Sequence, residues 1–173
     1  MIDRFVERAA AVGVDVRRLD GVERLGPEIS ARLRAAGAEA VTAWDVPMLR
    51  PVLEAIRAAG MTVTSDPAAA DAGVTSADHA IAETGTLVLA SGPGRPRATS
   101  LLPPHHIAIL PEGRIVATLF ELMPRLGALP SAFAFITGPS RTADIELTPV
   151  RGAHGPVAVT VFLVPGGSEE PPV

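Results

Sequence analysis

The chain has 173 residues, of which 47% are apolar and 3% aromatic, and its net charge is -4 at pH 7. A chain of this length suits one domain with a sizeable core, and an acidic chain with few aromatic residues is not typical of a nucleic-acid-binding protein. The absence of cysteine excludes a disulfide framework, a thiolate nucleophile and a cysteine-held iron–sulfur cluster on this chain.

No apolar run approaches the length of about 20 residues that spans a bilayer. Residues 1–12 are also too charged for a signal peptide. We therefore expect a cytoplasmic protein without a membrane span.

The first 64 residues alternate helical and extended patterns. Apolar residues at helical spacing predict three helices, which begin near Ile2, Pro27 and Pro47 and end at Gly13, Gly37 and Gly60. Each helix is followed by a short β-prone segment, at residues 14–19, 38–44 and 61–64. This order predicts a sheet that is covered by helices and parallel in this half.

Beyond residue 70 the pattern changes. We expect a short helical turn at residues 78–82, capped by Thr75 or Ser76, and a helix at 118–126 that Pro124 breaks and that buries Leu119, Leu122 and Met123. Strands are predicted at residues 87–90, 106–110, 115–116, 133–136 and 157–164, and a mobile loop at 91–100. Short turns between these strands favour antiparallel pairs. The fold class is therefore α/β, a three-layer mixed sheet with helices on both faces, in a single domain of residues 1–165 with a disordered tail at 166–173.

The segment from Phe135 to Pro156 carries a predicted binding loop. A β-prone run ends at Thr137-Gly138-Pro139, and Ser140 or Thr142 is placed to cap a short helix with Asp144 in its first turn and Pro149 at its end. Unpaired N–H groups at a helix start, together with the Arg141 guanidinium, favour an anion. The alternative is a capped loop in which Arg141 pairs with Asp144 or Glu146. The glycine-flanked turn that follows presents His154.

A second candidate site lies in the sequence IAETGT. Glu83 there suits a general base, a nucleophile or a ligand clamp, and Thr84, Gly85 and Thr86 resemble an anion nest. The alternative is a surface Glu83 that pairs with Arg95 or Arg97.

The four histidines show no spacing typical of a metal site. His105 and His106 are adjacent at a strand entrance, so their side chains should point to opposite faces of the sheet. His79 is expected on the helical turn. We expect no metal on this chain.

Four sequence blocks resemble the LUD domain family, of the lactate-utilisation protein C type: ADHAIAETGTLVL, LLPPHHIAILP, ITGPSRTADIE and GAHGP. The resemblance implies a NagB/RpiA/CoA-transferase-like fold and a part in oxidising L-lactate to pyruvate, beside partner proteins of which at least one carries iron–sulfur clusters. It implies no cofactor on this chain. The residues carried over as catalytic are Glu83, Asp144 and His154, and those carried over as substrate-binding are Thr84, Gly85, Thr86, His106, Gly138, Ser140, Arg141 and Thr142.

Two functions follow from these patterns. In the first, the chain is a subunit or accessory protein of a lactate-oxidising complex, and Glu83, Arg141 and His154 converge at one rim of the sheet around a small carboxylate or phosphate. In the second, it is a freestanding enzyme that acts on a phosphorylated or acyl-CoA small molecule. Glu83 would then be the nucleophile or base and Arg141 would bind the anion. An oligomer is compatible with both functions.

Overall fold

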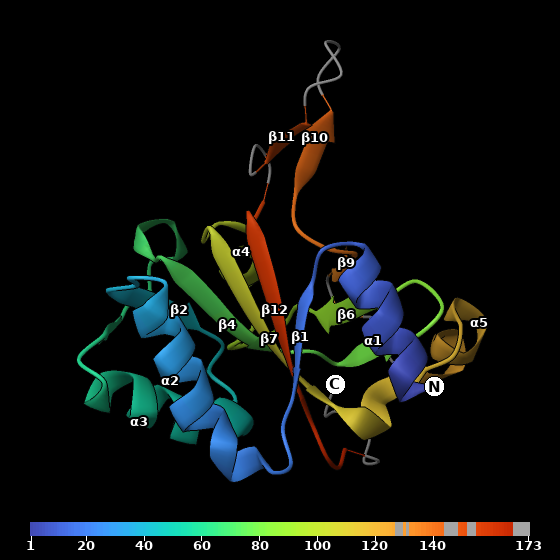
Figure 1. Cartoon of the computed structure of the whole chain (residues 1–173), viewed down its shortest axis with the longest axis horizontal. Coiled ribbons are helices and arrows are strands. Elements are labelled where there is room, and N and C mark those ends of the chain that lie inside the picture. The colour runs from blue at the N-terminus through green and yellow to red at the C-terminus, as the bar shows by residue number, and fades with distance from the viewer. Residues whose placement is uncertain (127–129, 131, 144–148, 152–154, 168–173) are drawn as a thin grey trace.

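The computed structural model describes residues 1–126, 130, 132–143, 149–151 and 155–167 (Figure 1). Its first half follows the predicted alternation of helices and strands. The elements are α1 (Ile2–Ala11), β1 (Asp15–Arg18), α2 (Leu25–Ala35), β2 (Ala40–Ala43), α3 (Arg50–Ala58) and β3 (Thr62–Val63). Two residues after each helix a glycine adopts a positive φ, at Gly13, Gly37 and Gly60, which confirms the predicted helix ends.

Six strands form a parallel sheet in the order β1-β12-β7-β4-β2-β3. Its further members are β4 (Ala72–Ser76), β7 (His105–Pro111) and β12 (Ala158–Val164). The last strand of the chain thus lies inside the sheet, between β1 and β7. Parallel pairing in the first half was predicted and is confirmed.

Helices cover both faces of this sheet. Helices α2 and α3 pack side by side on one face, where Arg32 of α2 bonds to Thr160 of β12 (Figure 1). The short helix α4 (Ala98–Leu101) packs on the other face. It lies so close to β4 that a Cβ added at Gly73 would collide with the Thr99 carbonyl oxygen. Val74, Ile107 and Thr160 are in register across three neighbouring strands, so their side chains lie on the same face of the sheet. Gly73, one residue before Val74, faces the other way, so its contact with α4 and the Arg32–Thr160 contact lie on opposite faces.

The remaining strands form a second sheet and a hairpin. The sheet has the order β8-β5-β6-β9, in which β6 pairs antiparallel with both neighbours while β5 and β8 are parallel. Its strands are β5 (His79–Ile81), β6 (Thr86–Ala90), β8 (Ile115–Val116) and β9 (Phe133–Ile136), and the hairpin consists of β10 (Arg141–Ala143) and β11 (Pro149–Arg151). The predicted α/β class and its mixture of strand directions are confirmed, with the antiparallel pairs gathered in these smaller sheets.

The main core joins the two sheets. Phe5 of α1, Trp44, Leu87 of β6 and Ile107 of β7 belong to one buried cluster, so α1 connects the layers. A smaller cluster of Ile81, Val88, Val116 and Leu122 lies beneath α5 (Leu119–Leu122).

Residues 78–82 do not form the predicted helical turn. Residues 79–81 are strand β5, paired with β6 and β8 and buried on both faces, and His79 lies on this strand. Neither Thr75 nor Ser76 caps a helix, since both belong to β4. The pairing of β5 with a strand on each side outweighs the local preference of this sequence, which also fits a turn.

The predicted helix after Ser140 is also wrong. Residues 141–143 and 149–151 pair antiparallel as β10 and β11. A helix start with unpaired N–H groups at Ser140 or Thr142 is therefore not formed. Asp144 lies outside the described residues.

Two further predictions need correction. The loop at 91–100 ends in α4, whose Thr99 and Ser100 are buried. The helix at 118–126 breaks before Pro124 as predicted, into α5 and a 3-10 turn, yet Leu119 and Met123 are about half exposed and only Leu122 of the three is buried. Residues 168–173 of the predicted tail lie outside the described residues. No helix among the described residues is long and apolar enough to cross a bilayer.

Candidate functional site

A cavity of about 500 Å³ opens beyond the carboxyl ends of β2 and β4. The cavity residues come from the last residues of β4 and β6, from the segments that follow β2, β4 and β6, from the turn before β8 and from the segment before β9. They are Trp44, Val46, Pro47, Met48, Ser76, Asp78, Ala90, Ser91, Gly92, Pro93, Arg95, Arg114 and Pro130.

The topology explains why the cavity forms there. The chain leaving β2 runs to α3 on one face, and the chain leaving its neighbour β4 passes through the second sheet to α4 on the other face. Two adjacent parallel strands whose connections diverge in this way leave a crevice at their carboxyl ends, where open α/β sheets bind ligands. The cavity therefore occupies the position in which this architecture places a binding site.

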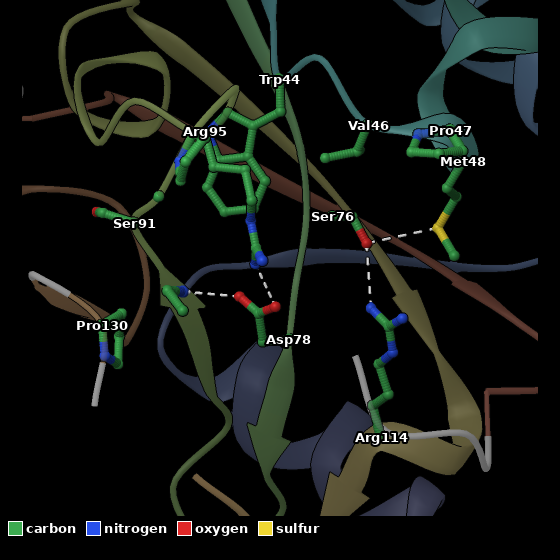
Figure 2. Close-up of a pocket in the computed structure, with 13 residues that line it drawn as sticks. Trp44, Val46, Pro47, Met48, Ser76, Asp78, Ser91, Arg95, Arg114 and Pro130 are labelled. Atoms are coloured by element: carbon green, nitrogen blue, oxygen red, sulfur yellow. Dashed lines mark hydrogen bonds and ion pairs between the residues drawn. The ribbon is translucent and has the colours of Figure 1, made fainter. Parts of the chain in front are cut away.

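A buried ion pair forms one wall of the cavity (Figure 2). The Asp78 carboxylate follows β4 directly, and it accepts hydrogen bonds from Arg95 and from the Ala90 N–H, the latter at 2.7 Å. The Arg95 guanidinium also lies 4.7 Å from the ring centroid of Trp44. The carboxylate balances the charge of Arg95, and the ring holds its guanidinium in place.

Arg114 is the second cation of the cavity, and its surroundings differ. It donates to the Ala77 carbonyl oxygen at 2.8 Å and to Ser76 Oγ at 3.3 Å, both neutral acceptors. Among the residues that the structure describes, no carboxylate lies within salt-bridge distance of it, and its buried Nε has no hydrogen-bond partner. Burial lowers the pKa of Arg114, the Asp78 charge opposes this shift and the Arg95 charge adds to it. A partly buried cation with neutral partners is suited to bind an anion.

The structure brings the first and third sequence blocks together, away from this cavity. Hydroxyl groups of Thr84, Thr86 and Thr137 form a chain with oxygen separations of 2.6 and 2.8 Å. Gly85 lies against the backbone of Ala9 in α1, with a φ of 70°. This threonine chain fastens the turn after β5 to the end of β9.

The other motif residues are distributed over the fold. Glu83 is exposed on the turn between β5 and β6, and Gly138 contacts Val12 at the end of α1. The Ser140 N–H donates to the Pro156 carbonyl oxygen. The structure describes Arg141 and Thr142 through the backbone of β10, and His154, like Asp144, lies outside the described residues. The convergence of Glu83, Arg141 and His154 stays a prediction.

His106 is fully buried, and the predicted divergence from His105 is confirmed. His106 Nε2 bonds to Thr75 Oγ1 at 2.8 Å on the α4 face, whereas His105 Nε2 bonds to Thr160 Oγ1 at 2.9 Å on the α2 face. Burial lowers the pKa of His106 to about 3, so its ring is neutral at pH 7. Among the described residues, no three His, Asp or Glu side chains gather as a metal site would require.

Sequence reasoning missed the residues that form the cavity. The sequence predicts a helical turn at residues 78–82 and no strand at β4, so the usual signal of such a site, a polar residue just after a buried strand, does not single out Asp78. Arg95 was considered only as a partner of Glu83, and the structure pairs it with Asp78 instead. Trp44 and Arg114 gave no signal in the sequence, because only the fold brings them to the same crevice.

Comparison with known proteins relates the whole chain to one family. Residues 2–164 match the family model described as LUD domain. A Halalkalibacterium halodurans protein named lactate utilization protein C is 32% identical over 95% of this chain and 79% of its own length. An Exiguobacterium protein of the same name is 44% identical, over 55% of this chain and only 44% of its own length. The crystal structure of a DUF162 family protein from Deinococcus radiodurans superposes with a TM-score of 0.72 at 25% identity, over 94% of this chain and 95% of that one.

Proposed function

Because this chain belongs to the LUD domain family, we propose that it acts in lactate utilisation, as a subunit or accessory protein of a cytoplasmic complex that oxidises L-lactate to pyruvate. The name of its relatives, lactate utilization protein C, supports the lactate part of this proposal. The alternative is a freestanding enzyme for a phosphorylated or acyl-CoA small molecule, as a relation to the NagB/RpiA/CoA-transferase superfamily would allow.

The contribution of this chain is a binding site for a small carboxylate, in the cavity at the ends of β2 and β4. The observation that carries this proposal is the state of Arg114, a partly buried cation whose partners are neutral. A ligand carboxylate would pair with it through charge-assisted hydrogen bonds. Asp78 keeps Arg95 neutralised, so the ligand meets one unbalanced positive charge.

Partner proteins would accept the electrons. Oxidation of lactate to pyruvate removes two electrons and two protons, and this chain has no cysteine with which to hold an iron–sulfur cluster. We therefore place iron–sulfur clusters on partner proteins. Glu83 is not among the cavity residues, so a catalytic role for it would place the reaction outside the cavity. Glu83, Asp144 and His154 stay the predicted catalytic residues, and the predicted ligand contacts stay Thr84, Gly85, Thr86, His106, Gly138, Ser140, Arg141 and Thr142.

Reconstitution tests the assignment. L-lactate oxidation is measured with an artificial electron acceptor, first with the purified chain alone and then with its cluster-bearing partners. We expect turnover only in the second case, and a lower rate there for Glu83→Gln. Turnover by the isolated chain would contradict the subunit role and favour the freestanding enzyme, whereas an unchanged rate in Glu83→Gln would remove that carboxylate from the reaction.

A further inference from the structure

The walls of the cavity are apolar on two opposite sides. Figure 2 shows Val46, Pro47 and Met48 on one side and Pro130 on the other. Ser76 and Asp78 lie between these walls, with the Arg114 guanidinium directed at Ser76. Ser76, Asp78 and Arg114 are therefore gathered in one part of the cavity. Ser91 is a further polar residue, on the side of Pro130 in Figure 2, and the rest of the lining is mainly apolar.

The size of the cavity exceeds what lactate can fill. Its volume of about 500 Å³ lies within the range of about 300–1,000 Å³ that is typical of sites for ligands much larger than a three-carbon acid. The methyl group of lactate is too small to contact both apolar walls. A ligand that only matched Arg114 would leave most of this surface in contact with water.

From this combination we infer that the cavity selects monocarboxylates whose apolar side chain is larger than the methyl group of lactate. The carboxylate pairs with Arg114, and the side chain lies between Val46 and Met48 on one side and Pro130 on the other. The inference rests on the proposed function of the cavity as a carboxylate site, and it makes the preferred ligand of the cavity a larger acid than the lactate that the complex oxidises.

The physical reason is the burial of apolar surface against walls that already exist. Each methylene group that enters such a site is expected to tighten binding about threefold to fourfold, until the cavity is full. A neutral analogue of the same length gains the apolar contacts without the pairing to Arg114, so it should bind at least about tenfold more weakly.

The chain carries its own probe for the test. Trp44 is its only tryptophan and lines the cavity, so its fluorescence reports on ligands that enter. Titrations of the full chain would use acetate, L-lactate, butyrate, hexanoate and hexanamide, with calorimetry as a second measurement. We expect affinity to rise from acetate to hexanoate and to be poor for hexanamide.

A variant that fills part of the cavity tests where the apolar side chain of the ligand lies. Val46→Phe should weaken hexanoate binding at least tenfold and leave acetate binding within about twofold, since it occupies apolar space away from Arg114. Val22→Phe, at a position that is 58% exposed and outside the cavity, is the matched control and should change neither.

The outcomes separate the two proposals. Equal binding of acetate and hexanoate by the parent chain would overturn the inference and leave the carboxylate site standing. Unchanged hexanoate binding in Val46→Phe would also overturn the inference alone. Hexanamide binding as tight as hexanoate would overturn the carboxylate site of the proposed function, and the inference with it. If no acid binds and Trp44 does not respond, both the site and the inference fail.

Discussion

The two arginines of the cavity have the same side chain and different surroundings. Arg95 is balanced by Asp78 and stacked on Trp44, whereas the hydrogen bonds that Arg114 makes with other described residues all go to neutral oxygens. Arg95 therefore supports the wall of the site, and Arg114 is the residue that a ligand anion can pair with. Both arginines line the same cavity, so their location does not distinguish them. The difference in their charge balance assigns the two roles.

Replacing Arg114 should affect binding far more than stability. We expect Arg114→Gln to weaken carboxylate binding about tenfold to a hundredfold, since hydrogen bonds to charged groups contribute about 1.5–3 kcal/mol. The free energy of unfolding should change by only about 1 kcal/mol, because the loss of two hydrogen bonds is offset by removing a partly buried charge. Trp44 fluorescence titration and urea unfolding measure the two effects. Arg57→Gln, on the exposed surface of α3, is the control, and equal binding by both variants would disprove the assignment.

Replacing Asp78 should affect stability far more than binding, in contrast to Arg114. Asp78→Asn leaves the Arg95 charge buried without its partner, since the two side chains are only 7% and 16% exposed. Breaking such a pair costs about 3–5 kcal/mol, which urea unfolding would show directly. Asp20→Asn removes a carboxylate that is 97% exposed and should leave stability unchanged. A similarly small effect of Asp78→Asn would mean that the ion pair is not a structural element.

His106 should make stability depend on pH. Its pKa is about 3 in the folded chain and close to the ordinary value of 6.5 when unfolded, so the unfolded state binds the proton more readily. The stabilisation is complete above pH 6.5, and it is lost as the pH falls from 6.5 towards 3, by up to about 1.4 kcal/mol per pH unit.

Comparison of the parent chain with His106→Gln isolates the contribution of the His106 proton to the pH dependence of stability. The glutamine amide can still bond to Thr75, and His79 and His105, whose pKa values burial also lowers, remain in both proteins. Urea unfolding between pH 4 and 7 gives the slope of the free energy of unfolding against pH. In the variant this slope should correspond to about one proton fewer taken up on unfolding. Identical slopes would contradict a buried neutral His106.

At the scale of elements, the turn between β5 and β6 is fitted to α1. Gly85 and Gly37 have nearly the same positive φ, 70° and 72°, but a Cβ at Gly85 would collide with the Ala9 backbone while a Cβ at Gly37 would meet nothing within 4 Å. Gly37→Ala should cost about 1 kcal/mol for the left-handed backbone alone, and Gly85→Ala about 2–4 kcal/mol because the collision is added. Thermal unfolding measures the difference. Equal costs would show that the turn does not pack tightly on α1.

Elements with a strong period and clear ends could be predicted from sequence. Helices α1, α2 and α3 have apolar stripes and glycine ends, and the apolar strands β6, β7 and β12 contrast with their turns. The short segments β5 and β10 could not, because a few residues fit a turn or a strand equally well and strand pairing decides between them. The cavity depends on that pairing, since Asp78 and Arg114 are brought together by β5 and β8.

At the scale of the molecule, the position of β12 makes the sheet depend on the end of the chain. A chain cut after Gly155 lacks the strand that fills the space between β1 and β7, and we expect it not to give cooperative unfolding. A chain cut after Gly167 keeps β12 and should unfold like the parent. Circular dichroism melts of both truncations test this, and a cooperative melt of the shorter one would contradict the expectation.

The same strand order has a consequence for synthesis in the cell. Ribosomes deliver β1 long before β12, so two facing strand edges wait for their common neighbour while the residues between them are synthesised. Unpaired edges of this kind recruit other chains. The parallel sheet therefore cannot close until β12 has been made, and chaperones that shield nascent chains should raise the soluble yield of this protein more than they would for a protein whose late strands lie at the sheet margin.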